Sequence, residues 1–274
     1  MAAQYKTIHP VKYYREYLAH DVRPDGRGLL EFRAVAVNVG SIGTADGSAI
    51  VKIGNTVVTC GVKAELTAPA ATEPGAGWLV PNVELPALCS PELRPGPPGD
   101  RAQAASHFLA ELVRNCGCVD PRRLCVAPGR LAWVLYCDVV CLDLDGSLLD
   151  ACTAALLAAL RTVTLPRVQY DGDSEETSVL LDQRESLDVL AHPAATTYAV
   201  FDDDTLIADP TAEEESLCSG LLTVVVEGGQ LCSVHKPGGS PLTHEQLQRC
   251  IALAHRRGRA VHNLVRAALC SPER

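Results

Sequence analysis

The chain has 274 residues, of which 47% are hydrophobic and 21% charged, and its formal net charge at pH 7 is −9. This composition is that of a globular protein with a sizeable core, and it excludes a disordered chain. The acidic balance argues against a free-standing nucleic-acid-binding protein, because contact with phosphates requires a basic face, but it allows a subunit that adds a few basic residues to a shared channel.

Residues 1–20 carry tyrosines and charges and are predicted to form a short helix. They lack the apolar core of a signal peptide. The longest apolar helical run, residues 151–160, is far shorter than the roughly 20 residues of a membrane span. We therefore expect a soluble intracellular protein that makes no contact with membranes.

A turn is predicted at Arg23-Pro24-Asp25-Gly26-Arg27. Pro24 presets φ at the second position, the Asp25 side chain can bond nearby backbone, and Gly26 closes the turn. Three strands are predicted to follow it, at residues 32–39, 48–54 and 56–64. The alternation of apolar and polar residues along the first is typical of a half-buried strand, and a glycine-containing turn joins the second to the third.

Two helices and a strand are predicted in the middle of the chain. Asp100 is expected to cap a helix whose apolar residues recur on one face, and Asp150 is expected to cap an alanine-rich helix over 151–161. Between them, residues 131–142 form a nearly continuous apolar run, which predicts a central strand covered on both faces. The small residues of the alanine-rich helix favour close packing between sheets and helices.

The second half of the chain begins with a polar, acidic stretch, residues 166–185, which we interpret as the boundary between two lobes. Thr243 and Gln246 match a capping box at the start of a terminal helix over 244–269. Four strands are predicted between the boundary and this helix, near residues 196–201, 205–208, 221–227 and 230–235.

This order predicts an α+β protein with two lobes of mixed sheet packed with helices. The expected organisation is an N-terminal helix and turn over residues 1–28, an N-terminal lobe over 29–166 and a C-terminal lobe over 186–270.

The chain contains 12 cysteines but no C-x-x-C pair of the kind that binds zinc. Several of them, such as Cys60 and Cys137, lie inside apolar runs, which predicts buried free thiols in a reducing compartment. An enzyme with a cysteine nucleophile has little support, because no cysteine stands beside a histidine in a recognisable motif. We expect no metal site and no cofactor.

The Arg23–Arg27 turn, the strand–turn–strand over residues 47–58 and the segment 60–65 together resemble the N-terminal half of an RNase PH-type domain. The resemblance implies the RNase PH fold, of the ribosomal protein S5 domain 2-like class. The family includes phosphorolytic ribonucleases and catalytically silent ring subunits of the RNA exosome. Which of the two describes this chain is decided by the residues at the catalytic positions.

Phosphorolysis of RNA requires cationic donors and a helix N-terminus to hold phosphate, and carboxylates for acid catalysis or metal binding. Where active relatives carry adjacent arginines at a helix start, this chain keeps Arg101 beside Asp100, with Arg94 upstream. Where active relatives read Asp-Gly-Gly-Thr-Arg, the arginine is replaced by Leu149, and Asp150 would repel phosphate.

A third catalytic position follows Asp209, where active relatives carry a Glu-Asp step and a later aspartate. Ser219, Gly220 and Leu221 occupy the stretch that should hold that second carboxylate. The acidic run Glu213-Glu214-Glu215 can be interpreted as a metal site, but we favour a solvated loop that touches a neighbouring subunit. Three independent catalytic requirements therefore fail together.

These departures, and motifs such as residues 133–138 and 235–240, resemble the non-catalytic branch of the exosome ring. The resemblance implies a structural and RNA-guiding subunit that supports 3′–5′ processing of ribosomal RNA and turnover of messenger RNA. It implies as partners the other RNase PH-like subunits of a six-membered ring, cap subunits of S1 and KH type, and associated exoribonucleases. RNA would pass through the central pore.

Lys63, Arg94 and Arg101 are the candidates for basic residues that meet this RNA. The resemblance also implies a location in nucleus, nucleolus and cytoplasm. The alternative is an active phosphate-dependent 3′–5′ exoribonuclease that uses Glu213–Glu215 in place of the usual acids.

Overall fold

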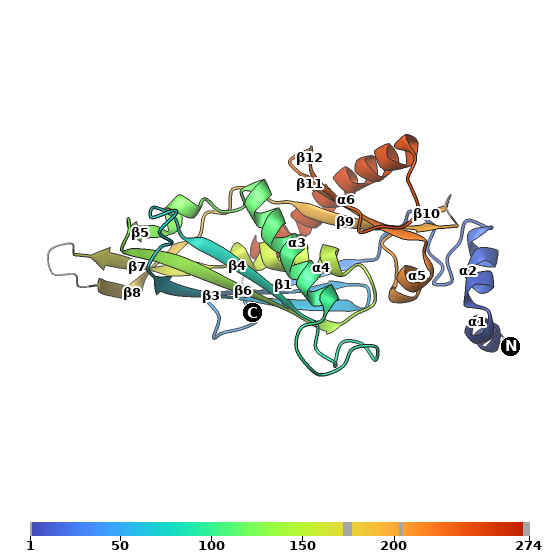
Figure 1. Cartoon of the computed structure of the whole chain (residues 1–274), viewed down its shortest axis with the longest axis horizontal. Coiled ribbons are helices and arrows are strands. Elements are labelled where there is room, and N and C mark those ends of the chain that lie inside the picture. Colours follow the sequence, from blue (N-terminus) through green and yellow to red (C-terminus); the bar gives the residue numbers. More distant parts are fainter. Residues whose placement is uncertain (1, 172–176, 203–204, 271–274) are drawn as a thin grey trace.

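The computed structural model describes residues 2–171, 177–202 and 205–270, which form two lobes (Figure 1). The sheet of the N-terminal lobe is mixed, because one of its pairings is parallel and the rest are antiparallel. Its strand order is β1 (Val35–Val39), β2 (Gly47–Ile53), β3 (Thr56–Thr67), β6 (Leu131–Asp143) and β4 (Trp78–Glu84), and β5 (Cys125–Ala127) pairs with β6.

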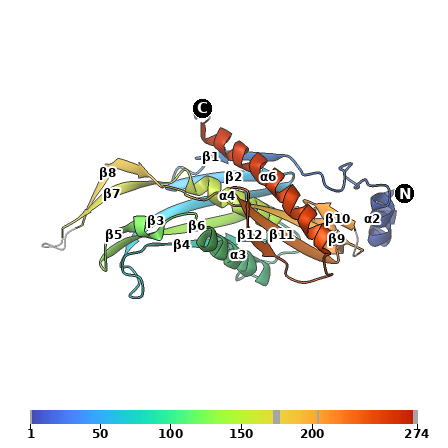
Figure 2. The same ribbon diagram turned by 90° about the horizontal axis from the view of Figure 1, so that it is seen from above.

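The sheet of the C-terminal lobe is antiparallel throughout. Its order is β10 (Thr205–Ala208), β9 (Ala194–Phe201), β11 (Gly220–Glu227) and β12 (Gln230–His235). In the sequence, the short helix α5 (Ala212–Leu217) connects β10 to β11. The long helix α6 (His244–Cys270) crosses both lobes and packs on β1, β9 and β11 (Figure 2). The predicted capping box is confirmed, because Thr243 and Gln246 exchange backbone-to-side-chain hydrogen bonds.

Helix α4 (Leu148–Leu160) lies at the centre of the molecule. It packs against β2 and β3 of one lobe and against β9 of the other, and nearly all of its residues are buried. Its alanines allow this double contact, because small side chains let two sheets approach one helix closely. Helix α3 (Asp100–Cys116) covers β4 and is followed by a short 3-10 helix (Pro121–Leu124). The prediction of α+β lobes with a tightly packed alanine-rich helix is confirmed.

The caps of these two helices differ from the prediction. Asp100 is the first residue of α3, and Gly99 stands at the N-cap position without a side-chain hydrogen bond. Asp150 lies inside the first turn of α4, whose N-cap is Ser147 with a left-handed backbone. Asp150 turns away from the helix start because Thr197 of the other lobe donates two hydrogen bonds to its carboxylate.

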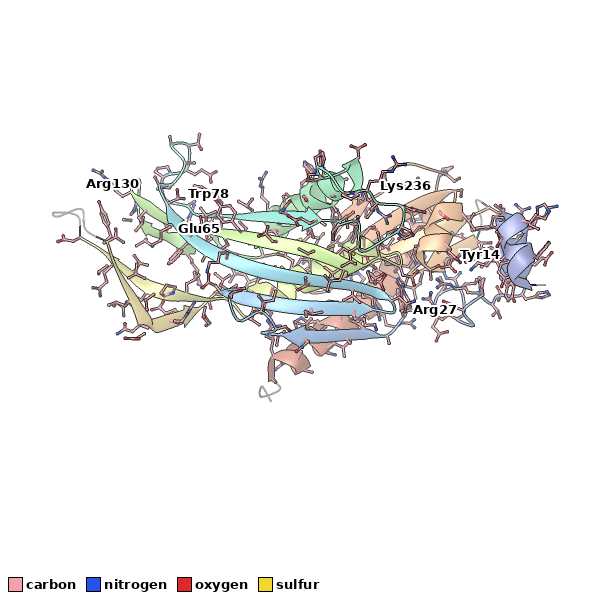
Figure 3. The ribbon with its side chains drawn as sticks, turned by 90° about the horizontal axis from the view of Figure 1, so that it is seen from below. Tyr14, Arg27, Glu65, Trp78, Arg130 and Lys236 are labelled. Carbon is pink, nitrogen blue, oxygen red and sulfur yellow. The ribbon has the colours of Figure 1, made fainter. Side chains whose placement is uncertain are left out.

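The central strand β6 is covered on one face only along its second half. Tyr136 and Leu142 are 40% exposed, whereas their neighbours Cys137 and Cys141 are fully buried. In Figure 3 no helix covers this outer face of the sheet. The prediction of a strand covered on both faces was wrong for this half of β6. A run of apolar residues shows that the side chains are hydrophobic, but it does not show whether a second layer covers them.

The N-terminal segment forms two helices, α1 (Ala2–Ile8) and α2 (Pro10–Leu18), separated at His9. Pro10 begins the second helix because it lacks an N–H that would otherwise need an acceptor. The predicted turn follows: Gly26 N donates to Arg23 O at 2.9 Å, and Arg27 N donates to Asp25 Oδ1 at 3.0 Å.

Strands β7 (Thr164–Tyr170) and β8 (Thr177–Ser186) form a hairpin that projects from one end of the molecule, opposite the N-terminal helices (Figure 1). The hairpin occupies the polar stretch 166–185, for which no strands are predicted from sequence. Most of its residues are exposed, so no apolar alternation marks it. Most of the acidic run 171–176 lies outside the described residues.

Candidate functional site

The three chain segments that phosphorolytic chemistry would use meet in a cleft between the lobes. One is the start of α3, another the start of α4, and the third the segment from Asp209 through α5. They border a cavity of about 190 Å³. Its lining includes the apolar residues Ala104, Ala105, Leu148, Leu149, Leu221 and Pro237 and the polar residues Arg101, Thr197, Glu215, Thr223 and His235.

Glu215, a residue of α5, places its carboxylate at the N-terminus of α4. Its Oε1 accepts a hydrogen bond from Ser147 N at 2.6 Å, and its Oε2 lies 2.8 Å from Arg101 Nη2. Burial raises the pKa of Glu215, although Arg101 and the Ser147 N–H act in the opposite direction. Backbone N–H groups at a helix start and an arginine are the donors that bind phosphate in proteins. Here an internal carboxylate engages both.

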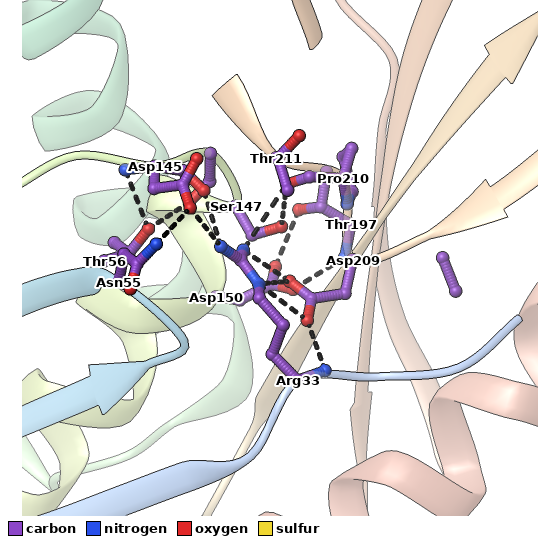
Figure 4. Close-up of polar contacts among 12 residues, drawn as sticks. Arg33, Asn55, Thr56, Asp145, Ser147, Asp150, Thr197, Asp209, Pro210 and Thr211 are labelled. Atoms are coloured by element: carbon purple, nitrogen blue, oxygen red, sulfur yellow. Dashed lines mark hydrogen bonds and ion pairs between the residues drawn. The ribbon is translucent and has the colours of Figure 1, made fainter. Parts of the chain in front are cut away.

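Near the start of α4, Arg33 joins the two lobes through hydrogen bonds to Asp145 and Asp209 (Figure 4). Its Nη2 lies 2.7 Å from Asp209 Oδ1, and its Nη1 donates to Asp145 O at 2.6 Å. Burial would raise the pKa of Asp209, but the hydrogen bonds and charge of Arg33 outweigh it and hold that pKa below its usual range. Asp209 is therefore a structural anion paired with Arg33.

Gly146 permits the close approach of the two segments at this point. Its φ is +76°, and a Cβ atom placed on it would lie 2.3 Å from Pro210 O. The adjoining Asp145 carboxylate accepts hydrogen bonds from Ala212 N and Asn55 Nδ2. Any larger residue at position 146 would force the α4 start away from the segment after β10.

The acidic run after Asp209 lies in helix α5 and not in a solvated loop. Glu214 is 2% exposed and pairs with the fully buried Arg23, which also donates to Ala208 O at 2.8 Å. Glu213 pairs with Lys6 and accepts from Tyr14 Oη at 2.5 Å. The prediction of a solvated loop was wrong because each glutamate has a cation supplied by a distant segment, and contact with a neighbouring subunit stays a prediction. Among residues 2–171, 177–202 and 205–270, no group of three metal-binding side chains is found.

Asp150 also differs from its predicted role as a group that repels phosphate. Its Oδ1 accepts from Thr197 Oγ1 at 2.6 Å and its Oδ2 from Thr197 N at 2.8 Å. Burial raises the pKa of Asp150 to about 7 despite these hydrogen bonds. The carboxylate lines a separate cavity on the far side of α4.

The three predicted RNA-contacting residues occupy different environments. Arg101 lines the cleft and pairs with Glu215, while 48% of its side chain is exposed. Lys63 is exposed on β3, with its Nζ 3.7 Å from Asp46. Arg94 is exposed in the loop before α3. The structure does not bring the three to one place, and their contact with RNA stays a prediction.

Sequence reasoning did not single out Arg33 or the role of Arg23 as a buried ion-pair residue. The turn motif at Arg23 predicts the backbone conformation there, but it does not predict the partners of the guanidinium. None of the helices in the described part of the chain is long and apolar enough to cross a membrane. The cysteines within the core, including Cys60 and Cys137, are free and buried as predicted.

Comparison with known proteins places this geometry in a family. Residues 31–166 match domain 1 of the 3′ exoribonuclease family, and residues 191–257 match domain 2. Exosome complex component rrp43 of Schizosaccharomyces pombe is 39% identical over 251 residues, which are 91% of this chain and 93% of that protein. Exosome complex component Rrp42 of Pyrococcus furiosus is 34% identical over 258 residues, 94% of this chain and 92% of that one.

Solved structures of exosome chains have the same fold. An Archaeoglobus fulgidus exosome with RNA bound to the active site contains a chain that matches with a TM-score of 0.83 and 29% identity, covering 92% of this chain and 96% of that one. A chain of an archaeal exosome core matches with a TM-score of 0.81 and 25% identity, covering 97% and 100%. The fold, the cleft and these matches together show that the chain belongs to the RNase PH, or 3′ exoribonuclease, family.

Proposed function

We propose that this protein is a non-catalytic, structural and RNA-guiding subunit of an RNA exosome core ring. The observation that carries the proposal is Glu215, whose carboxylate engages both the Ser147 N–H at the start of α4 and the guanidinium of Arg101. The names of the relatives in Schizosaccharomyces pombe and Pyrococcus furiosus, both exosome complex components, support the assignment to that assembly.

Phosphorolysis needs an anion site beside the RNA 3′ end and a carboxylate free to act on it. In the cleft, Leu148, Leu149 and Leu221 form apolar walls where phosphate would need cationic donors. The acids Asp209 and Glu214 are each paired with a buried arginine. A phosphate ion that entered would meet the Glu215 carboxylate, and the repulsion between the two anions would disfavour binding.

The proposed partners are other RNase PH-like ring subunits, with cap subunits of S1 and KH type and associated exoribonucleases joined to the same core. RNA would pass through the central pore, and the protein would act in nucleus, nucleolus and cytoplasm. The net charge of −9 fits a subunit whose surface mostly meets protein. The uncovered outer face of the N-terminal sheet, with Tyr136 and Leu142 at 40% exposure, supports such contacts.

The test has two measurements. Purified chain, alone and together with an RNase PH-like ring partner, is incubated with 3′-labelled RNA and inorganic phosphate, and release of nucleoside diphosphates is followed. We expect none above the buffer control. Release that survives repurification and requires Glu213, Glu214 or Glu215 would establish the alternative, an active exoribonuclease.

The second measurement is the native mass of the complex recovered from cells through a tag on this chain. A hetero-oligomer of about nine chains supports the proposal, because six ring subunits would carry three cap subunits. A homo-oligomer without other RNase PH-like chains would contradict it.

A further inference from the structure

A second cavity lies along the face of α4 that runs from Asp150 to Arg161, between that helix, the segment before β9 and α6. Its volume is about 30 Å³. Most of its lining is apolar, but four basic side chains border it: Arg161, His192, Arg257 and His262. The one acidic group in its lining is Asp150, whose two carboxylate oxygens are engaged by Thr197.

Two of these basic side chains have buried polar atoms without a partner. Arg161 Nη1 and His192 Nδ1 are both inaccessible to solvent and form no hydrogen bond with any described residue. The rings of His192 and His262 lie 5.2 Å apart, so a second imidazole faces the same space. Leaving a buried charged donor such as the Arg161 guanidinium without a partner is unfavourable. An acceptor from outside the chain would remove this penalty.

The cavity adjoins a larger surface groove. The groove has a volume of about 890 Å³, runs between α6 and the turn joining β11 to β12, and shares His192, Ala194 and His262 with the cavity. Its charged and titratable lining consists of His192, Glu227, His255, Arg259 and His262. A groove of this size holds several residues of an extended chain.

We propose that the groove binds an acidic segment of a partner protein and that one Asp or Glu carboxylate of that segment enters the small cavity to meet Arg161 and His192. The size of the cavity favours this ligand, because about 30 Å³ holds roughly two water-sized groups. The two oxygens of a carboxylate fit that space, whereas a phosphodiester adds two further oxygens and two sugars. Arginine and carboxylate form strong charge-assisted hydrogen bonds.

The proposal does not depend on the absence of catalysis in the other cleft. It is tested on the full-length chain, together with its ring partner if that is how the chain is soluble, with fluorescein-labelled hexaglutamate as the probe and hexaglutamine as the uncharged control. Binding is followed by fluorescence anisotropy. We expect hexaglutamate to bind and hexaglutamine to bind at least about tenfold more weakly.

The Arg161→Met variant should weaken hexaglutamate binding about tenfold, since it removes the guanidinium at nearly unchanged volume. The matched control is Arg256→Met, because Arg256 is an exposed arginine on α6 that borders neither cavity. The control should change binding less than twofold. Equal effects of the two variants would show that only net charge matters and would overturn the proposal.

Two further outcomes are decisive. If hexauridylate binds more tightly than hexaglutamate and loses its binding in Arg161→Met, the cavity serves RNA and the proposal is wrong. In the unmutated protein, sodium acetate should shift the NMR ring resonances of His192 and His262 and leave those of the exposed His107 unchanged. If acetate moves none of these resonances, the cavity holds only water and the proposal also fails.

Discussion

The start of α4 contacts the carboxylate of Glu215, which lies in α5. At the other end of α4, Arg161 has a guanidinium nitrogen for which no described residue provides a hydrogen-bond acceptor. Glu215 satisfies Ser147 N and Arg101 at one end, and Arg161 Nη1 remains unpaired at the other. The first place borders the cleft between the lobes, and the second borders the cavity along α4. Glu215 thus supplies an acceptor from within the chain at the first place, and no described residue supplies one to Arg161 Nη1 at the second.

Glu214, next to Glu215 in α5, forms a buried ion pair with Arg23. The largest effect on stability is expected from breaking this pair. Arg23→Met should lower the free energy of unfolding by about 3–5 kcal/mol, because it leaves the Glu214 carboxylate buried without its cation. Urea denaturation measures this. The matched control is Arg15→Met, which breaks the solvent-exposed pair with Asp202 and should change stability far less.

The double variant Arg23→Met with Glu214→Leu should recover more than half of the lost stability, since no unpaired charge then remains. Recovery of nothing would mean that Arg23 stabilises the fold mainly through its hydrogen bonds to the Ala208 and Asp209 carbonyls.

Asp150, in the first turn of α4, predicts a dependence of stability on pH. Its pKa is raised by burial to about 7 in the folded chain and is about 3.9 in an unfolded one. Between these values the folded state holds a proton that the unfolded state has lost, so stability falls as pH rises from about 4 to 7 and is then constant. Asp150→Asn should remove this decline and stabilise the protein at pH 8 by about 2–4 kcal/mol.

Thermal melting of both proteins across that pH range measures the effect. Asn keeps an acceptor for Thr197 N and a donor for Thr197 Oγ1, so the local hydrogen bonds can persist. Parallel pH profiles for the two proteins would show that Asp150 is already ionised in the folded chain at low pH.

The hydrogen bonds that Glu215 forms with Ser147 N and Arg101 can be removed by substitution. Glu215→Ala should cost about 1 kcal/mol and leave Ser147 N–H and Arg101 without an anion. Inorganic phosphate should then raise the melting temperature of the variant more than that of the parent, whereas Glu213→Ala, which removes a glutamate bound to Lys6 and Tyr14, should respond like the parent. A variant that is indifferent to phosphate would mean that Glu215 is only a packing residue.

The smallest effect is expected at Arg94. This side chain is exposed, so Arg94→Glu should change stability by less than about 0.5 kcal/mol. If it meets RNA phosphates in the assembled ring, binding should weaken equally for all RNA sequences and its salt dependence should decrease. Arg101→Glu differs, because it also breaks the pair with Glu215. Unchanged binding at low and high salt for Arg94→Glu would remove this residue from the RNA path.

Features that rest on neighbouring residues were predictable from the sequence. The turn at Arg23–Arg27, the four C-terminal strands and the Thr243–Gln246 capping box agree with the structure to within about two residues. Each depends on alternation or on turn and cap chemistry within a few positions, so a single segment contains the information. Family motifs likewise indicated the RNase PH fold, because they are read along the chain.

Only the tertiary structure decided which side chain meets which. Asp150 bonds Thr197, 47 positions away, and Arg33 bonds Asp209, 176 positions away. The same glutamate chemistry in Glu213, Glu214 and Glu215 leads to three different partners because three distant segments converge on α5. Arg161 Nη1 and His192 Nδ1 lack a partner for the same reason: whether a polar atom finds one depends on how the lobes pack around α4, and the local sequence does not determine that packing.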